Sequence, residues 1–242
     1  MKLTALVLVL AACGREPAHI SIGAAASLRH AMPELVEQYK SEGGVDVDVS
    51  YGASDLLGDQ VSQGAALDAV VLADAVELDK LIAARAVAAD SRRAIASNRI
   101  VLVGPVGAEI KFATLAALHD STKIAVGDPA TVPAGRYAKQ YLETLGEWTS
   151  VQDQLVFGGD VAGVLALAKQ GRARIAVVYR TDARAAAPLV VLDEPADAPT
   201  ASIVAGIATH SRHAAAARAF AEFLASAQAR QILARHGFAP PT

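Results

Sequence analysis

The sequence contains little cysteine, few aromatic residues and little charge. Only one of its 242 residues is a cysteine, and this residue, Cys13, cannot form an internal disulfide. Charged residues make up 19% of the chain and hydrophobic residues 53%, a balance that excludes an intrinsically disordered protein. The 22 basic and 25 acidic residues give a net charge of −3 without a basic stripe, so we expect no nucleic-acid partner.

Catalytic motifs are also missing from the sequence. Ser54 stands in the segment 52–56 (GASDL), which lacks the second glycine of a Gly-x-Ser-x-Gly nucleophile motif. There is no Walker loop and no His-Glu-x-x-His, and the six histidines are scattered. A hydrolase that uses Ser54 remains an alternative, but no base for it is visible. We therefore expect a protein that is not an enzyme, without cofactor and without a metal bound directly by side chains.

The first residues predict an export signal. Lys2 precedes the short apolar run 3–10, which is followed by Ala11, Ala12 and Cys13. The run is too short to cross a bilayer as a helix, which takes about 20 residues. The segment 10–13 (LAAC) favours a lipoprotein signal over residues 1–12, with Cys13 lipidated and residues 13–18 as a tether. The alternative is an ordinary signal with a chance cysteine.

Short apolar runs alternate with amphipathic segments along the rest of the chain. This alternation predicts an α/β protein whose sheets are mostly parallel and covered on both faces. Strands are predicted at residues 19–24, 45–49, 68–72, 99–103, 123–126, 174–178, 189–192 and 202–208. Helices are predicted at residues 27–40, 54–64, 74–84, 134–145, 161–170, 213–224 and 227–235. The chain is long enough for one large or two small domains.

Small or hydroxyl residues stand where several of these helices begin. The segments are 24–28 (AAASL), 51–54 (YGAS), 128–135 (DPATVPAG) and 158–161 (GGDV), and a fifth segment, 177–179 (VVY), ends a strand with a phenol. Helix N-termini bind anions through free N–H groups and about half a positive charge each. Together these segments predict a cage of neutral donors for a tetrahedral anion.

Each candidate donor also has a purely structural interpretation. Ser27 and Ser54 could be ordinary N-caps, a role that does not prevent them from binding an anion. Ala134 follows a helix-starting proline, and its small side chain would let an anion approach the backbone. Val161 follows Asp160, the expected N-cap of its helix. Tyr179 could be a packing residue, although ligands of open α/β sheets bind beyond the carboxyl ends of strands.

These segments resemble the molybdate-binding proteins of bacterial ABC importers, and the resemblance extends from about residue 20 to residue 238. Its most specific part is the stretch 126–138 (VGDPATVPAGRYA). The resemblance implies a two-lobed periplasmic-binding-protein fold of type II, in which each lobe is a mixed sheet flanked by helices and the anion binds in the cleft. It also implies that two serines, two backbone amides and a tyrosine hold the anion. These roles fall on Ser27, Ser54, Ala134, Val161 and Tyr179.

The resemblance further implies how the chain is divided and what it binds. We expect residues 19–97 plus 203–242 to form one lobe and residues 98–202 the other, with crossings near 98–105 and 193–200. The expected ligand is molybdate or tungstate, and the expected partners are a permease and its ATPase, with the protein itself a monomer. A sulfate or phosphate binder is the alternative. Phosphate would need a carboxylate acceptor, for which Asp55 and Asp160 are the candidates.

Overall fold

The computed structural model describes residues 19–119 and 121–241. The predicted signal, the tether and Cys13 lie outside the described residues. No helix in the described ranges is long and apolar enough to cross a membrane.

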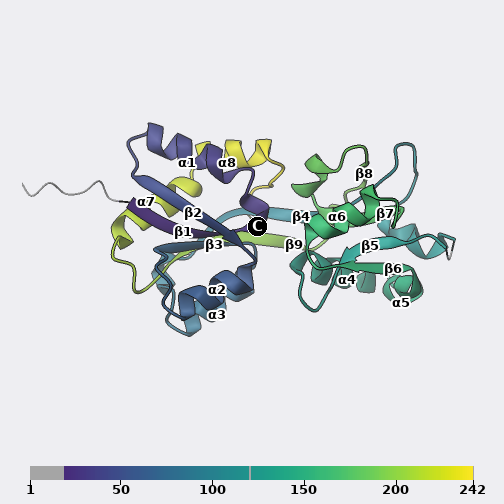
Figure 1. Ribbon diagram of the computed structural model, residues 1–242, viewed down its shortest axis with the longest axis horizontal. Helices are drawn as coiled ribbons and strands as arrows, with labels where there is room; N and C mark the ends of the chain where they lie inside the picture. Colours follow the sequence, from purple (N-terminus) through teal and green to yellow (C-terminus); the bar gives the residue numbers. More distant parts are fainter. Residues whose placement is uncertain (1–18, 120, 242) are drawn as a thin grey trace, which may run out of the picture.

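Strands and helices alternate along the chain for most of its length (Figure 1). The strands are β1 (His19–Ala25), β2 (Asp46–Gly52), β3 (Ala69–Leu72), β4 (Arg93–Gly104), β5 (Ile124–Gly127), β6 (Leu155–Gly158), β7 (Ile175–Tyr179), β8 (Val190–Asp193) and β9 (Thr200–Ile207). The α-helices are α1 (Met32–Ser41), α2 (Ser54–Ser62), α3 (Ala75–Ala83), α4 (Pro133–Thr144), α5 (Trp148–Val151), α6 (Val161–Lys169), α7 (Ala214–Leu224) and α8 (Ala227–Arg235). Short 3₁₀ helices include η1 (Ala26–Leu28), η3 (Phe112–Ala117) and η5 (Asp182–Ala185).

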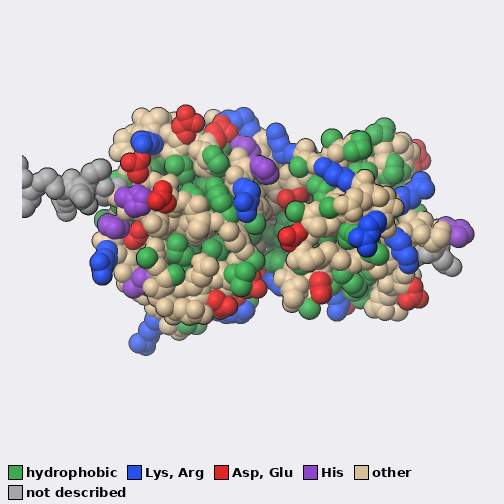
Figure 2. Space-filling view, viewed as in Figure 1, with side chains coloured by type: hydrophobic (Ala, Val, Ile, Leu, Met, Phe, Trp, Pro, Cys, Tyr) green, Lys and Arg blue, Asp and Glu red, His purple; other side chains and the backbone are tan. Residues whose placement is uncertain are grey.

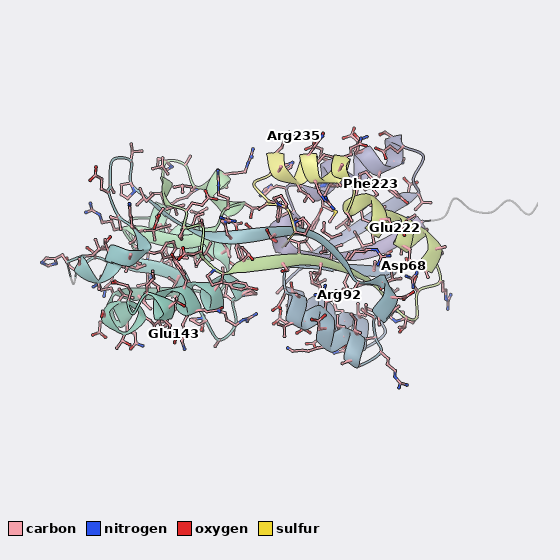
Figure 3. The ribbon with its side chains drawn as sticks, turned by 180° about the vertical axis from the view of Figure 1, so that it is seen from behind. Asp68, Arg92, Glu143, Glu222, Phe223 and Arg235 are labelled. Atoms are coloured by element: carbon pink, nitrogen blue, oxygen red, sulfur yellow. The ribbon has the colours of Figure 1, made fainter. Side chains whose placement is uncertain are left out.

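The strands are ordered β2-β1-β3-β9-β4-β7-β5-β6, and β8 pairs with β4. Strands β4 and β9 pair with each other and pass through the middle of the molecule from one lobe into the other, as the view from behind shows (Figure 3). They join two lobes. The first lobe holds β1–β3 with α1–α3, α7 and α8, and the second holds β5–β8 with α4–α6 (Figure 1).

Each lobe has hydrophobic clusters on both faces of its part of the sheet. In the first lobe, α1, α7 and α8 bury one face, while α2 and α3 bury the other. In the second lobe, α4, α5 and η3 cover one face and α6 covers the opposite face. The two-lobed α/β architecture expected from the resemblance is confirmed. The sheet is less parallel than the alternation predicted, because four strand pairs are parallel and four are antiparallel.

The antiparallel pairs arise from β4 and β9. The strand predicted at 99–103 begins at Arg93, so that β4 pairs with β9 over its first part and with β7 over its second. The loop 193–200 was expected to cross between the lobes but packs on the second lobe, where Asp197 accepts a hydrogen bond from Tyr141 of α4. The chain therefore passes from one lobe to the other within β4 and β9. The hydrogen bonds between these two strands hold the lobes together.

Two further expectations were wrong. The helix predicted at 27–40 begins only at Met32, after the short η1 and a turn. The reason is Pro33, which fits the first turn of a helix but would break an interior because it lacks an N–H group. Strand β6 was not predicted, since its apolar run 155–157 is short and only its pairing with β5 makes it a strand.

Candidate anion-binding site

The carboxyl ends of β1, β2 and β3 meet at one edge of the first lobe, because these strands are parallel. Ser27 lies just beyond β1, in η1. Its Oγ is buried and has no hydrogen-bond partner among the described residues. Ser27 is therefore not the N-cap of a long helix, and its free hydroxyl, rather than a strong helix dipole, is what it can offer to an anion.

Ser54 lies beyond β2 and is the first residue of α2, with Ala53 as the N-cap. Its buried Oγ accepts a hydrogen bond of 3.0 Å from the N–H of Ala73, the residue after β3. This bond joins the ends of β2 and β3 and orients the hydroxyl. Because the oxygen accepts this bond, the hydroxyl proton remains available to a ligand.

Ala134 lies in the first turn of α4, directly after Pro133. The start of this helix is pressed against the end of β5, since a Cβ added to Gly135 would lie 2.1 Å from the carbonyl oxygen of Gly127. The preceding loop is closed by the Asp128 carboxylate, which accepts from the N–H of Ala130 at 2.9 Å. Ala134 itself is only 1% exposed. Its backbone N–H is one of the helix-start groups that lack a partner within the helix.

Val161 is the first residue of α6, and the expected N-cap is confirmed. The Asp160 carboxylate accepts from the N–H of Gly163 at 2.6 Å rather than from Val161. The helix start lies close to the end of β6, because a Cβ on Gly158 would lie 2.7 Å from the N of Val164. The cap therefore uses a later amide of the first turn, and the N–H of Val161 remains a candidate donor.

Tyr179 is the last residue of β7 and is 5% exposed. Its hydroxyl is buried and has no hydrogen-bond partner among the described residues. Burial raises the pKa of the phenol well above its ordinary value, and the nearby Tyr137 and Asp182 raise it further. The phenol therefore stays protonated and is a neutral hydrogen-bond donor.

The carboxyl ends of β5, β6 and β7 form the edge of the second lobe, and this edge faces the corresponding edge of the first. A hollow between the lobes is visible in the space-filling view (Figure 2). A cavity of about 410 Å³ is lined by Ser27 of the first lobe and Val161 of the second. Its lining does not include Ser54, Ala134 or Tyr179, although Ala134 and Tyr179 share one buried cluster.

Among the lining residues that sequence reasoning missed, Asp182 carries a buried charge-bearing group. This residue begins η5, three residues beyond Tyr179, and its Oδ2 is buried without a partner in the described part of the chain. Burial raises the pKa of its carboxyl to about 6, against a smaller opposing effect of hydrogen bonds from Thr181 and the backbone. Its position after a strand that ends in a candidate ligand was the signal available in the sequence.

The two carboxylates that were considered for the pocket serve other purposes. Asp55 accepts a hydrogen bond from the N–H of Leu56, and Asp160 caps α6. Arg136 forms an ion pair of 2.9 Å with Asp74 across the cleft. Within residues 19–119 and 121–241, no group of three or more His, Cys, Asp or Glu side chains could hold a metal ion.

Two lobes joined by paired strands, with helix starts facing the cleft, define a periplasmic binding protein of type II. The chain matches the family model described as bacterial extracellular solute-binding protein over residues 20–239, and it belongs to that family. The family description places its members outside the cytoplasm, as solute binders rather than enzymes.

Relatives confirm the resemblance found in the sequence. The chain is 34% identical over 226 residues to the molybdate-binding protein ModA of Escherichia coli (strain K12). The aligned region covers 90% of this chain and 88% of ModA. It is 34% identical over 223 residues to YvgL of Bacillus subtilis (strain 168), named as a candidate ABC transporter substrate-binding lipoprotein, covering 90% of this chain and 85% of YvgL.

Among solved structures, the substrate-binding domain of a candidate molybdenum ABC transporter from Clostridium difficile superimposes with a TM-score of 0.81. The two sequences are 30% identical, and the superposition covers 93% of this chain and 99% of the other.

Proposed function

We propose that this protein captures molybdate, and also tungstate, in the cleft and delivers it to the permease and ATPase of an ABC importer. One observation carries the proposal. The hydroxyls of Ser27 and Tyr179, on facing edges of the two lobes, are buried and have no partner among the described residues. Leaving a buried donor unpaired costs about 1–3 kcal/mol, so these hydroxyls are expected to bind a ligand. The similarity to ModA supports molybdate as that ligand.

The proposed cage consists of the Ser27 and Ser54 hydroxyls, the N–H groups of Ala134 and Val161, and the phenol of Tyr179. All of these donors are neutral. A hydrogen bond from a neutral donor to a charged acceptor contributes about 1.5–3 kcal/mol. Five such bonds sum to about 7.5–15 kcal/mol, and the upper part of this range is what a micromolar Kd, about −8.2 kcal/mol, requires after the costs of association and closure.

We further propose that residues 19–97 plus 203–242 and residues 98–202 close on the anion as two rigid lobes about a hinge. The separate hydrophobic clusters support this division, because Ala96 and Ile203 belong to a first-lobe cluster while Ile100 and Ala201 belong to one in the second lobe. The protein is proposed to act as a monomer. Sedimentation with and without molybdate would test this, and a mass greater than that of one chain in either state would contradict it.

Calorimetry with molybdate, tungstate, sulfate and phosphate tests the proposed ligand. Sulfate is also a tetrahedral dianion, but it is smaller, and a cage that fits molybdate would leave about two donors unpaired around it. At about 1–3 kcal/mol each, two such losses give at least about thirtyfold discrimination. Ala134→Leu should abolish binding by filling the cage. Sulfate competing equally with molybdate would favour the sulfate-binding alternative instead.

The lipid anchor at Cys13 is proposed from the sequence, since Cys13 lies outside the described residues. The naming of YvgL as a lipoprotein supports it. We expect mass spectrometry of the protein from its own membrane to find a lipid on Cys13, and Cys13→Ser to release the protein in soluble form. An N-terminal peptide with a free Cys13 thiol would contradict the anchor.

A further inference from the structure

Asp182 shares its cavity with two proposed donors, Ser27 and Val161. It stands at the start of η5, directly beyond the strand that ends in Tyr179. Its Oδ2 is buried, and no donor in the described ranges reaches this oxygen. A buried carboxylate oxygen without a donor is costly while it carries charge. The cost grows when a second negative charge enters the same cavity, because like charges at close range disfavour each other.

Two basic side chains of the cavity, Arg184 and His236, are directed to other partners. Arg184 donates through Nη1 to the carbonyl oxygen of Arg235, at the end of α8. His236 Nε2 lies 2.9 Å from the Glu34 carboxylate of α1.

The remaining neighbours of Asp182 offset the burial of its charge only in part, through hydrogen bonds from Thr181 and the backbone. His30, from the turn before α1, also lines the cavity. Thr181 binds Asn98 of β4, whose Nδ2 donates to the threonine oxygen at 2.9 Å. The phenol of Tyr179 remains neutral, as its raised pKa shows. The described residues therefore supply no ion pair to Asp182.

We propose that Asp182 takes up one proton from the solvent when a tetrahedral dianion binds, so that the closed site holds a neutral carboxyl beside the anion. This inference rests on the proposed anion-binding function. The proton moves from water or buffer to the carboxylate, and no other bond changes. The neutral carboxyl removes the repulsion, and its O–H becomes an additional donor in the cavity.

Asp182 would then determine how the affinity depends on pH. Burial raises the pKa of its carboxyl to about 6 in the unliganded protein. At pH 7.5 roughly one carboxyl in thirty is therefore already protonated, and the rest must take up a proton on binding. Half of the carboxyls are protonated at pH 6, so the affinity for molybdate should fall by up to about sixteenfold between pH 6 and pH 7.5.

Isothermal titration with molybdate in buffers of different ionisation enthalpy measures the protons taken up on binding. At pH 7.5 the wild-type protein should take up nearly one proton per anion. Asp182→Asn keeps the size of the side chain without its charge. It should take up none, bind up to about thirtyfold more tightly at pH 7.5, and lose most of the pH dependence. His30→Gln and His236→Gln are matched controls from the same cavity, and both should retain the proton uptake.

The outcomes distinguish this inference from the function on which it rests. Molybdate binding without proton uptake, or with uptake that persists in a folded Asp182→Asn variant, overturns the role of Asp182 and leaves the proposed function intact. Uptake that disappears in His30→Gln or His236→Gln but not in Asp182→Asn overturns it as well. A wild-type protein that binds no molybdate contradicts the proposed function and this inference together. Thermal melting verifies that each variant is folded.

Discussion

Asp74 Oδ2 lies 2.9 Å from Arg136 Nη2, so that the start of α3 in the first lobe is joined to the first turn of α4 in the second. The same carboxylate caps α3, because its Oδ1 accepts from the N–H groups of Val76 and Glu77. The ion pair spans the cleft beside the proposed cage. It can therefore form only when the lobes are close together, and it should favour the closed state.

Removing this ion pair should weaken anion binding without unfolding the protein. Arg136 is 46% exposed, so solvent screening limits the contribution to at most about 1 kcal/mol, or about fivefold in affinity. We expect Arg136→Ala and Asp74→Asn each to raise the Kd for molybdate severalfold, with less effect in high salt. Asparagine at position 74 still caps the helix. Calorimetry of the single and double variants measures the coupling.

The ion pair between Arg92 and Asp79 offers the control for this experiment, since it has a similar length of 3.0 Å but lies within the first lobe. Arg92→Ala should leave the affinity unchanged. An equal loss in Arg92→Ala, or additive effects of Arg136→Ala and Asp74→Asn, would show that the contact across the cleft does not act in closure.

The two serines should differ in their effect on stability. Ser27→Ala and Ser54→Ala should each weaken molybdate binding by about 1–3 kcal/mol, since an anion oxygen loses its donor. Only Ser54→Ala should also lower the unfolding free energy, by about 1–3 kcal/mol, because the N–H of Ala73 loses its acceptor. Chemical denaturation and calorimetry measure the two effects. The exposed Ser62 provides the control substitution, and wild-type affinity in both serine variants would refute the cage.

Tyr179→Phe should change stability and affinity in opposite directions. The unliganded protein loses an unpaired buried hydroxyl, so its unfolding free energy should stay the same or rise. Affinity for molybdate should fall by about 1–3 kcal/mol. In Tyr141→Phe, by contrast, a hydroxyl that binds Asp197 at 2.8 Å is removed, so stability should fall and affinity should not. Melting curves with and without molybdate separate these cases; a destabilised Tyr179→Phe would argue for a structural role.

A methyl group at Gly135 should disturb the site, whereas one at Gly159 should not. The Cβ of Gly135→Ala would lie 2.1 Å from the Gly127 carbonyl oxygen, so the start of α4 must move away from β5. We expect a loss of about 1–3 kcal/mol in stability, as for other overpacked sites, together with weaker anion binding. A Cβ at Gly159 meets nothing within 4 Å. Similar affinities for the two alanine variants would show that α4 is not part of the cage.

The stability of the unliganded protein should depend on pH through Asp182. Because its pKa is raised from 3.8 to about 6, the neutral carboxyl stabilises the folded state below pH 3.8, and this contribution is lost as the pH rises through 6. The loss amounts to at most about 3 kcal/mol. Asp182→Asn should therefore be more stable than the wild type at pH 7.5 but not at pH 4. Denaturant titrations at both pH values measure the unfolding free energies. If the difference between Asp182→Asn and the wild type were the same at pH 7.5 and pH 4, the raised pKa would be excluded.

The helices were predictable wherever the apolar period and the end signals agreed. Helices α7 and α8 are examples, because the predicted ranges 213–224 and 227–235 match them within one residue. The prediction failed at the first helix, where the apolar period continued through Pro33 although the backbone could not. It also failed at β6, since a strand of four residues is stabilised by pairing with its neighbour rather than by its own pattern.

The sequence by itself determined the α/β class, the family and the candidate donors, because these follow from local periodicity and from motifs that are contiguous in the chain. Only the tertiary structure decided which side chains meet. The ion pair of Asp74 and Arg136 joins residues 62 positions apart, and the bond from Ala73 to Ser54 joins two strand ends. The isolation of Asp182 in its cavity likewise depends on what surrounds it. Burial and pairing are properties of packed neighbours, and a single sequence does not specify neighbours that are distant along the chain.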